Sequence, residues 1–186
     1  MKKLAVFASG SGTNFEAIAS ACADGRIKDA EVALMVCDKS GAAVVARAAR
    51  HAVRSFVFDP GSYACKADYE REIASLMDSL GIDLVCLAGY MRIVGPTLLE
   101  AYEGRMINIH PALLPSFKGA HAVEDAVAFG VKVFGITIHW VSSELDGGKI
   151  ISQKAFEYDG SDPAEVHALG QPIEHQLYID TINKLL

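Results

Sequence analysis

The strongest constraint on the fold is an alternation of short apolar runs with segments of helical spacing. The first run, Lys3–Ser9, is almost continuously apolar and is followed by glycines. Such a run is typical of a strand that is buried on both faces of a parallel sheet. Lys66–Leu80 carries its apolar residues on one face and its charges elsewhere, which is typical of an amphipathic helix. Such alternation indicates parallel strands joined by right-handed crossovers. We expect a single α/β domain over residues 1–186, with a mostly parallel twisted sheet and helices on both faces.

The same patterns divide the rest of the chain into elements. The expected strands are Lys3–Ser9, Val32–Cys37, Ser55–Phe58, Asp83–Ala88, Ile107–His110, Phe134–Val141 and Lys149–Phe156. The expected helices are Asn14–Asp24, Gly41–Ala52, Lys66–Leu80, Pro96–Tyr102, Val123–Phe129 and Asp162–Leu186, the last with a bend or break at Gly170 and Pro172. The last two strands are expected to pair with each other, and the pattern leaves an antiparallel arrangement open.

Charge limits the partners that the chain can bind. The formal net charge is −6 and the pI is about 5.5. That balance argues against a broad surface for nucleic acid or for an acidic membrane, although it permits a local cationic pocket for one phosphate. No segment approaches the length of a membrane span. We therefore expect no nucleic-acid partner and no membrane partner.

The N-terminal segment and the cysteines bear on the compartment. Met1–Lys3 followed by Leu4–Ala8 could begin a signal peptide, but Ser9–Gly12 cuts the apolar run short, which favours a strand. The four cysteines show no CxxC pairing, and Cys37 and Cys86 sit in apolar runs where small buried residues are usual. A reduced, cytoplasmic compartment fits best.

Ser9-Gly10-Ser11-Gly12-Thr13-Asn14 is the first candidate site, between the first strand and the first helix. Glycines let a backbone approach a ligand, and free N–H groups at a helix start favour a phosphate. The segment is not a Walker A loop, and Phe15 stands where a dinucleotide fingerprint needs its third glycine. The alternative is a tight turn in which Thr13 or Asn14 caps the helix. On spacing alone, we place monophosphate binding slightly ahead of a tight turn with a capped helix.

Asn108 and His110 are the second candidate, at the end of a strand that Pro111 stops. Alternation should point both side chains to the same side, at a carboxyl edge where open α/β sheets bind ligands. Asn108 can donate to a developing oxyanion, and His110 can give or take a proton near neutral pH. The alternative is structural: Asn108 caps the loop and His110 bonds a backbone carbonyl.

Asp146 is the third candidate, within the Glu144–Gly148 turn. A carboxylate in such a turn usually serves the turn itself. If this loop folds over the carboxyl edge of the sheet, Asp146 meets His110 and favours its imidazolium form. The remaining histidines indicate no metal site: His121 and His139 are expected to be structural, and His51, His167 and His175 lack ligand spacing.

Four motifs occur in order along the chain, and together they resemble one family. They are Gly10-Ser11-Gly12-Thr13-Asn14, Ala88-Gly89-Tyr90-Met91-Arg92-Ile93, Asn108-Ile109-His110-Pro111 with Leu113-Leu114-Pro115, and Glu144-Leu145-Asp146-Gly147-Gly148. This set resembles the phosphoribosylglycinamide formyltransferases of purine biosynthesis, also called glycinamide ribonucleotide transformylases. The resemblance covers essentially the whole chain and implies their Rossmann-like formyltransferase fold.

The resemblance implies transfer of a formyl group from the co-substrate 10-formyltetrahydrofolate to the amine of glycinamide ribonucleotide, without a metal. It implies a catalytic set and two binding sets. The catalytic set is Asn108, His110 and Asp146. The ribonucleotide set is Gly12, Thr13 and Asn14 at the phosphate, with Glu174 near the ribose. The folate set is Lys66, Met91, Arg92, Ile93, Val94, Asn108, Ser142, Ser143 and Glu144, with Lys66 standing where the family usually has arginine.

Other functions remain open beside this one. Methionyl-tRNA formyltransferase resembles the chain around Asn108–Pro115 but adds a nucleic-acid-binding domain, and formyltetrahydrofolate deformylase adds an N-terminal regulatory domain. A non-catalytic sensor of a phosphorylated ligand is a further alternative, but it leaves Asn108, His110 and Asp146 together unexplained. A monomer and a homodimer are both compatible with the sequence.

Overall fold

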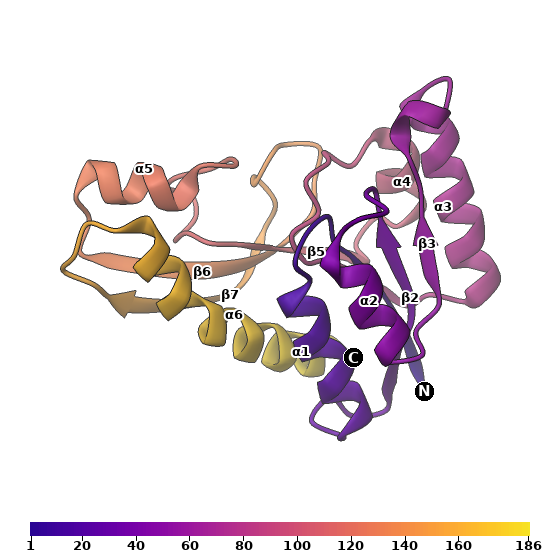
Figure 1. Ribbon diagram of the computed structural model, residues 1–186, viewed down its shortest axis with the longest axis horizontal. Helices are drawn as coiled ribbons and strands as arrows, with labels where there is room; N and C mark the ends of the chain where they lie inside the picture. The colour runs from indigo at the N-terminus through magenta and orange to yellow at the C-terminus, as the bar shows by residue number, and fades with distance from the viewer.

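The computed structural model describes residues 1–186 and contains one seven-stranded sheet in the order β3-β2-β1-β4-β5-β6-β7 (Figure 1). The strands are β1 (Lys2–Phe7), β2 (Ala30–Cys37), β3 (Ser55–Val57), β4 (Leu84–Leu87), β5 (Met106–His110), β6 (Val133–Trp140) and β7 (Ile150–Glu157). β1 to β5 are all parallel to one another, whereas β6 runs antiparallel to both β5 and β7. The expected mostly parallel α/β sheet is confirmed, and the last two strands are antiparallel.

The helices cover both faces of the sheet. They are α1 (Thr13–Ala23), α2 (Ala43–Arg50), α3 (Lys66–Leu80), α4 (Pro96–Ala101), α5 (Ala122–Phe129) and α6 (Pro163–Leu185), with a short 3₁₀ turn, η1 (Pro60–Ser62). α1, α2 and α6 share one apolar cluster with the sheet, and α3 and α4 share another on the opposite face (Figure 1). α5 packs on a smaller cluster with β6 and the start of α6.

β1 shows why its sequence is continuously apolar. Leu4 and Val6 lie in the cluster beneath α1, α2 and α6, while Ala5 and Phe7 lie in the cluster beneath α3 and α4. All four side chains are fully buried. A strand that is covered on both faces gains from apolar residues at every position, by about 1.5–3 kcal/mol for a large side chain.

The order of the strands determines where a ligand can reach the sheet. β1 lies between β2 and β4, so the chain leaves β1 in one direction to build β2 and β3 and returns on the other side to build β4 and β5. Such a switch of direction opens a crevice outside the carboxyl ends of the strands. The loop that follows β1 and the loop that follows β4 both start at this crevice, where the Ser9 N–H donates to the Gly89 carbonyl at 3.0 Å.

Of the bend or break expected in the terminal helix, the break is wrong, since α6 is continuous from Pro163 to Leu185 with Pro172 inside it. An internal proline removes one helical hydrogen bond and costs about 3 kcal/mol. Packing offsets that cost: Tyr178 is fully buried and its hydroxyl donates to the Leu87 carbonyl at 2.9 Å. Gly170 is also buried, close to the side chains of β6 and β7. None of the helices is both long and apolar enough to cross a lipid bilayer.

Candidate active site

Asn108 and His110 lie at the carboxyl end of β5, beside the antiparallel strand β6. β6 places His139 directly opposite Asn108, and partners across two strands face the same side of the sheet. The Asn108 amide nitrogen is 3.2 Å from His139 Nε2. His139 Nδ1 is 2.9 Å from the Trp140 carbonyl. A carbonyl can only accept, so Nδ1 carries a proton and Nε2 faces the cluster.

Asp146 joins this cluster from the loop between β6 and β7. Its carboxylate lies 3.5 Å from His110 Nδ1 and 3.6 Å from His139 Nε2. The same carboxylate accepts the Gly119 N–H at 2.8 Å. Only 8% of the Asp146 side chain is exposed. The structure therefore brings Asn108, His110 and Asp146 together, although they are far apart in the sequence.

The local backbone explains why the loop turns inward. Asp146 has a φ of +49°, in the left-handed region that aspartate tolerates better than most residues. The Gly147 N–H donates to the Glu144 carbonyl at 3.1 Å and closes the turn. Gly148 has no room for a side chain, because a Cβ there would lie 1.6 Å from the Trp140 carbonyl oxygen. An ion pair of 2.7 Å between Lys118 and Glu144 fastens the outside of the loop.

The two ring nitrogens of His110 have different surroundings. Nε2 donates to the Phe117 carbonyl at 2.8 Å, which fixes the plane of the ring. Nδ1 faces Asp146 at 3.5 Å, which is an ion-pair distance but too long for an N–H···O hydrogen bond. The ring is buried, with 4% of the residue exposed. His110 is therefore held in one orientation, and its Nδ1 has no hydrogen bond of ordinary length to the protein.

The Asp146 carboxylate is strongly stabilised in its ionised form. Its pKa is lowered from 3.8 to about 2, above all by the His139 imidazole beside it. Burial acts in the opposite direction, while the Gly119 N–H and the charge of His110 lower the pKa further. Asp146 is consequently a fixed negative charge over the whole neutral pH range. The sequence pattern predicts a structural role for His139, whereas the structure places it next to both Asn108 and Asp146.

The depressed pKa of Asp146 predicts a pH-dependent contribution to folding. The unfolded chain protonates this carboxyl near 3.8 and the folded chain only near 2, so the stabilisation is present above about pH 4 and is lost as the pH falls toward 2. Asp146→Asn is expected to lose roughly 2 kcal/mol of unfolding free energy at pH 6 and much less at pH 2.5. Urea unfolding at both pH values checks this. A difference between the proteins that stays constant with pH would contradict it.

The glycine loop after β1 meets α6 at the same edge of the sheet. Gly12 is the N-terminal cap of α1, with a φ of +72°, and no side chain caps this helix. The alternative in which Thr13 or Asn14 caps α1 is therefore wrong. The Asn14 amide instead donates to the Glu174 carboxylate at 2.9 Å, and Thr13 lies 3.5 Å from Gln171. The structure thus places Gly12, Thr13, Asn14 and Glu174 around one end of the crevice.

The segment Met91–Val94 exposes apolar side chains beside this crevice. Met91 is 69% exposed and Ile93 is 65% exposed. Exposed large apolar residues that cluster usually mark a binding surface. Arg92 forms an ion pair of 2.9 Å with the buried Asp38. Lys66, at the start of α3, donates to the Ile93 carbonyl, so its ammonium lies against this segment.

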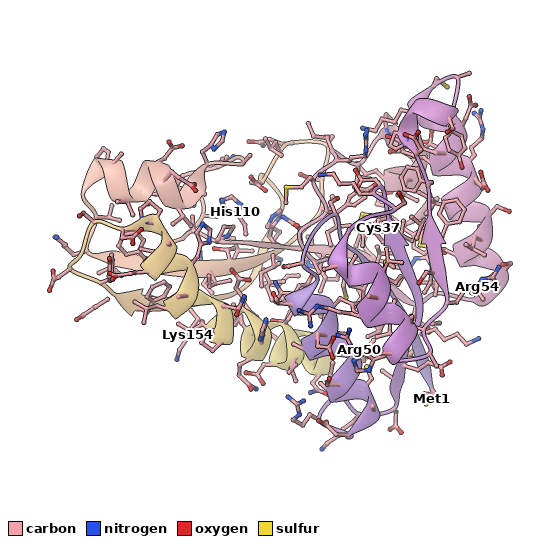
Figure 2. All side chains as sticks on the ribbon, viewed as in Figure 1. Met1, Cys37, Arg50, Arg54, His110 and Lys154 are labelled. Atoms are coloured by element: carbon pink, nitrogen blue, oxygen red, sulfur yellow. The ribbon has the colours of Figure 1, made fainter.

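The arrangement can therefore do two kinds of chemistry at one edge of the sheet. Figure 2 shows His110 near the middle of the molecule, between α5 and α1. An amide donor, an imidazole and a fixed carboxylate together can move a proton and stabilise an oxyanion. The neighbouring glycine loop offers backbone N–H groups to an anion. Group transfer involving an anionic substrate fits both features.

The chain also matches proteins of known name. A family model described as formyl transferase matches residues 2–182. The phosphoribosylglycinamide formyltransferase of Bacillus subtilis is 48% identical, over 100% of this chain and 95% of that protein. Among solved structures, glycinamide ribonucleotide transformylase 1 from Geobacillus kaustophilus is 47% identical with a TM-score of 0.96, over 100% of this chain and 99% of that chain. Phosphoribosylglycinamide formyltransferase from Bacillus halodurans is 48% identical with a TM-score of 0.95, over 100% and 95%.

These matches agree with the four motifs and with the geometry of the cluster. They extend over nearly the full length of both this chain and its relatives, and the relatives are transferases by name. A non-catalytic sensor is therefore not supported. The chain belongs to the formyl transferase family, and within it to the phosphoribosylglycinamide formyltransferases.

Proposed function

We propose that this enzyme transfers the formyl group of 10-formyltetrahydrofolate to the primary amine of glycinamide ribonucleotide, in purine biosynthesis. The observation that carries the proposal is the convergence of Asn108, His110 and Asp146 at the same edge of the sheet as a glycine loop with free N–H groups. The four cysteines are free, which suits a cytoplasmic enzyme.

In the proposed reaction the amine nitrogen attacks the formyl carbon, and the formyl oxygen becomes an oxyanion. The Asn108 amide and the protonated His110 stabilise that charge, and removal of one such donor typically costs about 3–4 kcal/mol. His110 Nδ1 is suited to this because it has no competing short hydrogen bond. Collapse of the tetrahedral intermediate breaks the bond from carbon to N10 of the folate, which takes up a proton as the amine loses one.

Asp146 supports this chemistry as a fixed charge. With a pKa of about 2 it is ionised throughout the neutral pH range. It can therefore pair with positive charge that develops on His110 and can pass on the amine proton, directly or through a water molecule. The Gly119 N–H holds the carboxylate in place, with the His139 ring 3.6 Å away.

The two substrates occupy neighbouring sets of residues in this proposal. Gly12, Thr13 and Asn14 hold the ribonucleotide phosphate, and Glu174 lies near the ribose. The folate occupies the exposed apolar segment and the loop that covers the site; these residues are Lys66, Met91, Arg92, Ile93, Val94, Asn108, Ser142, Ser143 and Glu144. Bringing both substrates together in one orientation supplies much of the acceleration.

Turnover of both substrates tests the proposed function directly. Purified enzyme mixed with 10-formyltetrahydrofolate and glycinamide ribonucleotide is expected to change the folate absorbance and to raise the mass of the ribonucleotide by one formyl group. Formyl transfer to water alone would indicate a deformylase instead. Binding of both compounds without turnover would contradict the catalytic roles.

A side chain at Gly12 is expected to weaken ribonucleotide binding far more than folate binding. The backbone there has a φ of +72°, and a Cβ would lie 2.5 Å from the Val44 side chain. Gly12→Ala must therefore shift the loop that holds the phosphate. Calorimetry with each substrate measures the effect. Gly10→Ala is the matched control, because a Cβ at Gly10 meets no atom within 4 Å. If Gly12→Ala weakened the affinity for both substrates equally, the assignment of the phosphate to this loop would be wrong.

A further inference from the structure

In the glycine loop (Ser9–Asn14), three backbone carbonyls accept hydrogen bonds within the protein, whereas the last three backbone N–H groups donate none. The N–H groups of Gly12, Thr13 and Asn14 donate to no acceptor in the protein. The carbonyls of Gly10, Ser11 and Gly12 all accept a hydrogen bond. In a planar trans peptide the carbonyl and the next N–H point in opposite directions. A donor that holds one of these carbonyls therefore aims the following N–H group away from the protein body, toward a ligand.

Helix α2 supplies the donors for two of these carbonyls. The Val44 N–H donates to the Gly10 carbonyl at 3.1 Å, and the Arg47 Nε–H donates to the Ser11 carbonyl at 2.8 Å. The second bond is charge-assisted and joins a side chain to the peptide whose N–H belongs to Gly12. The stretch Ser9–Asn14 contains no lysine or arginine of its own.

The Arg47 guanidinium is itself held in one orientation. Its Nη1 is 3.1 Å from the Glu16 carboxylate, which also lies 3.3 Å from Arg50 and 2.7 Å from His51. These partners keep the pKa of Glu16 below its ordinary value, with His51 as the largest cause. Arg50 follows about one turn later in α2, and 59% of its side chain is exposed, against 28% for Arg47. Of the two arginines, only Arg47 has a hydrogen bond to the loop.

We propose that Arg47 is a positioning residue for the substrate phosphate. It fixes the Ser11 carbonyl so that the Gly12 N–H points outward, and it adds a positive charge behind a loop that has none. The inference rests on the proposed function, because it assumes that this loop receives the phosphate of a ribonucleotide. A positioning role for Arg47 can be told from a purely structural role, because only a positioning role makes the effect of its substitution depend on whether the substrate carries the phosphate.

The test compares two substrates that differ only in that group. Kinetics are measured with glycinamide ribonucleotide and with the corresponding ribonucleoside, which lacks the phosphate. Arg47→Met is expected to raise the KM for the ribonucleotide by about tenfold or more, as expected for loss of a hydrogen bond from a charged group, and to change kcat less. The kcat/KM for the ribonucleoside is expected to stay within about twofold of wild type.

Two further variants distinguish the orientation that Arg47 gives to the loop from its effect on folding and from its charge. Arg50→Met removes the neighbouring cation from Glu16 but no bond to the loop, and is expected to leave both substrates unchanged. Arg47→Lys keeps the charge but not the fork that reaches both Glu16 and Ser11, so an intermediate KM for the ribonucleotide is expected. Because the ribonucleoside is measured on the same preparation, partial unfolding would lower both activities in parallel.

Each outcome decides the inference. Equal losses with both substrates, or an unchanged KM for the ribonucleotide in Arg47→Met, would overturn it. A wild-type protein that turns over neither substrate would contradict the proposed function instead. In that case titration with inorganic phosphate decides the role of Arg47: an affinity about tenfold weaker in Arg47→Met supports it, and an equal affinity refutes it.

Discussion

Replacement of His110 by alanine is expected to lower kcat by about 10³-fold, with the KM for each substrate changed by no more than about threefold. General acid–base groups contribute about 10²–10⁴-fold, and a donor to an oxyanion about 10²–10³-fold. His110 is in a position to do both, because its Nε2 is anchored on the Phe117 carbonyl while Nδ1 faces the cluster. Steady-state kinetics with both substrates measure the loss.

A second substitution separates protonation from packing. His110→Gln fills much of the buried space and retains a polar group, but it cannot carry the positive charge, so we expect nearly the same loss of kcat. His167→Ala is the control, since His167 is half exposed on α6 and lies 3.8 Å from Glu124. Near-normal turnover in His110→Gln would leave His110 with a structural role only.

Most of the fold could be predicted because its strands are buried on both faces. β1 reads as a strand from composition alone, since each of its faces meets a different apolar cluster. The helix bounds of α3 agree with the predicted Lys66–Leu80 because its apolar face is continuous. α6 differs because local propensity at Pro172 is outweighed by the burial of residues further along, such as Tyr178. That burial is tertiary, and no window of sequence around Pro172 contains it.

The sequence predicts three members of the candidate site, Asn108, His110 and Asp146, but not the contacts among them. Alternation along β5 predicts a common side for Asn108 and His110, and the turn residues predict a loop at Asp146. For His139 the pattern predicts a structural role, because a histidine in an alternating strand usually has one. Its contact with Asn108 depends on the register between β5 and β6, which pairs these two residues across the sheet. Register between strands that are distant in the sequence is not encoded in either strand alone.

Asp146→Asn is expected to lower kcat by about 10²-fold or more at neutral pH. The amide keeps the shape and still accepts the Gly119 N–H, but it brings no negative charge to the buried cluster and cannot take up the amine proton. Steady-state rates at pH 7.5, on protein shown to be folded by circular dichroism, check the prediction.

The control for this variant is a carboxylate outside the site. Asp159→Asn removes a charge that is 96% exposed and 3.8 Å from Lys132, and it is expected to leave kcat unchanged. If Asp146→Asn kept more than about a tenth of the wild-type rate at pH 7.5, the carboxylate would have no role in proton transfer, because loss of a general base typically costs about 10²-fold or more.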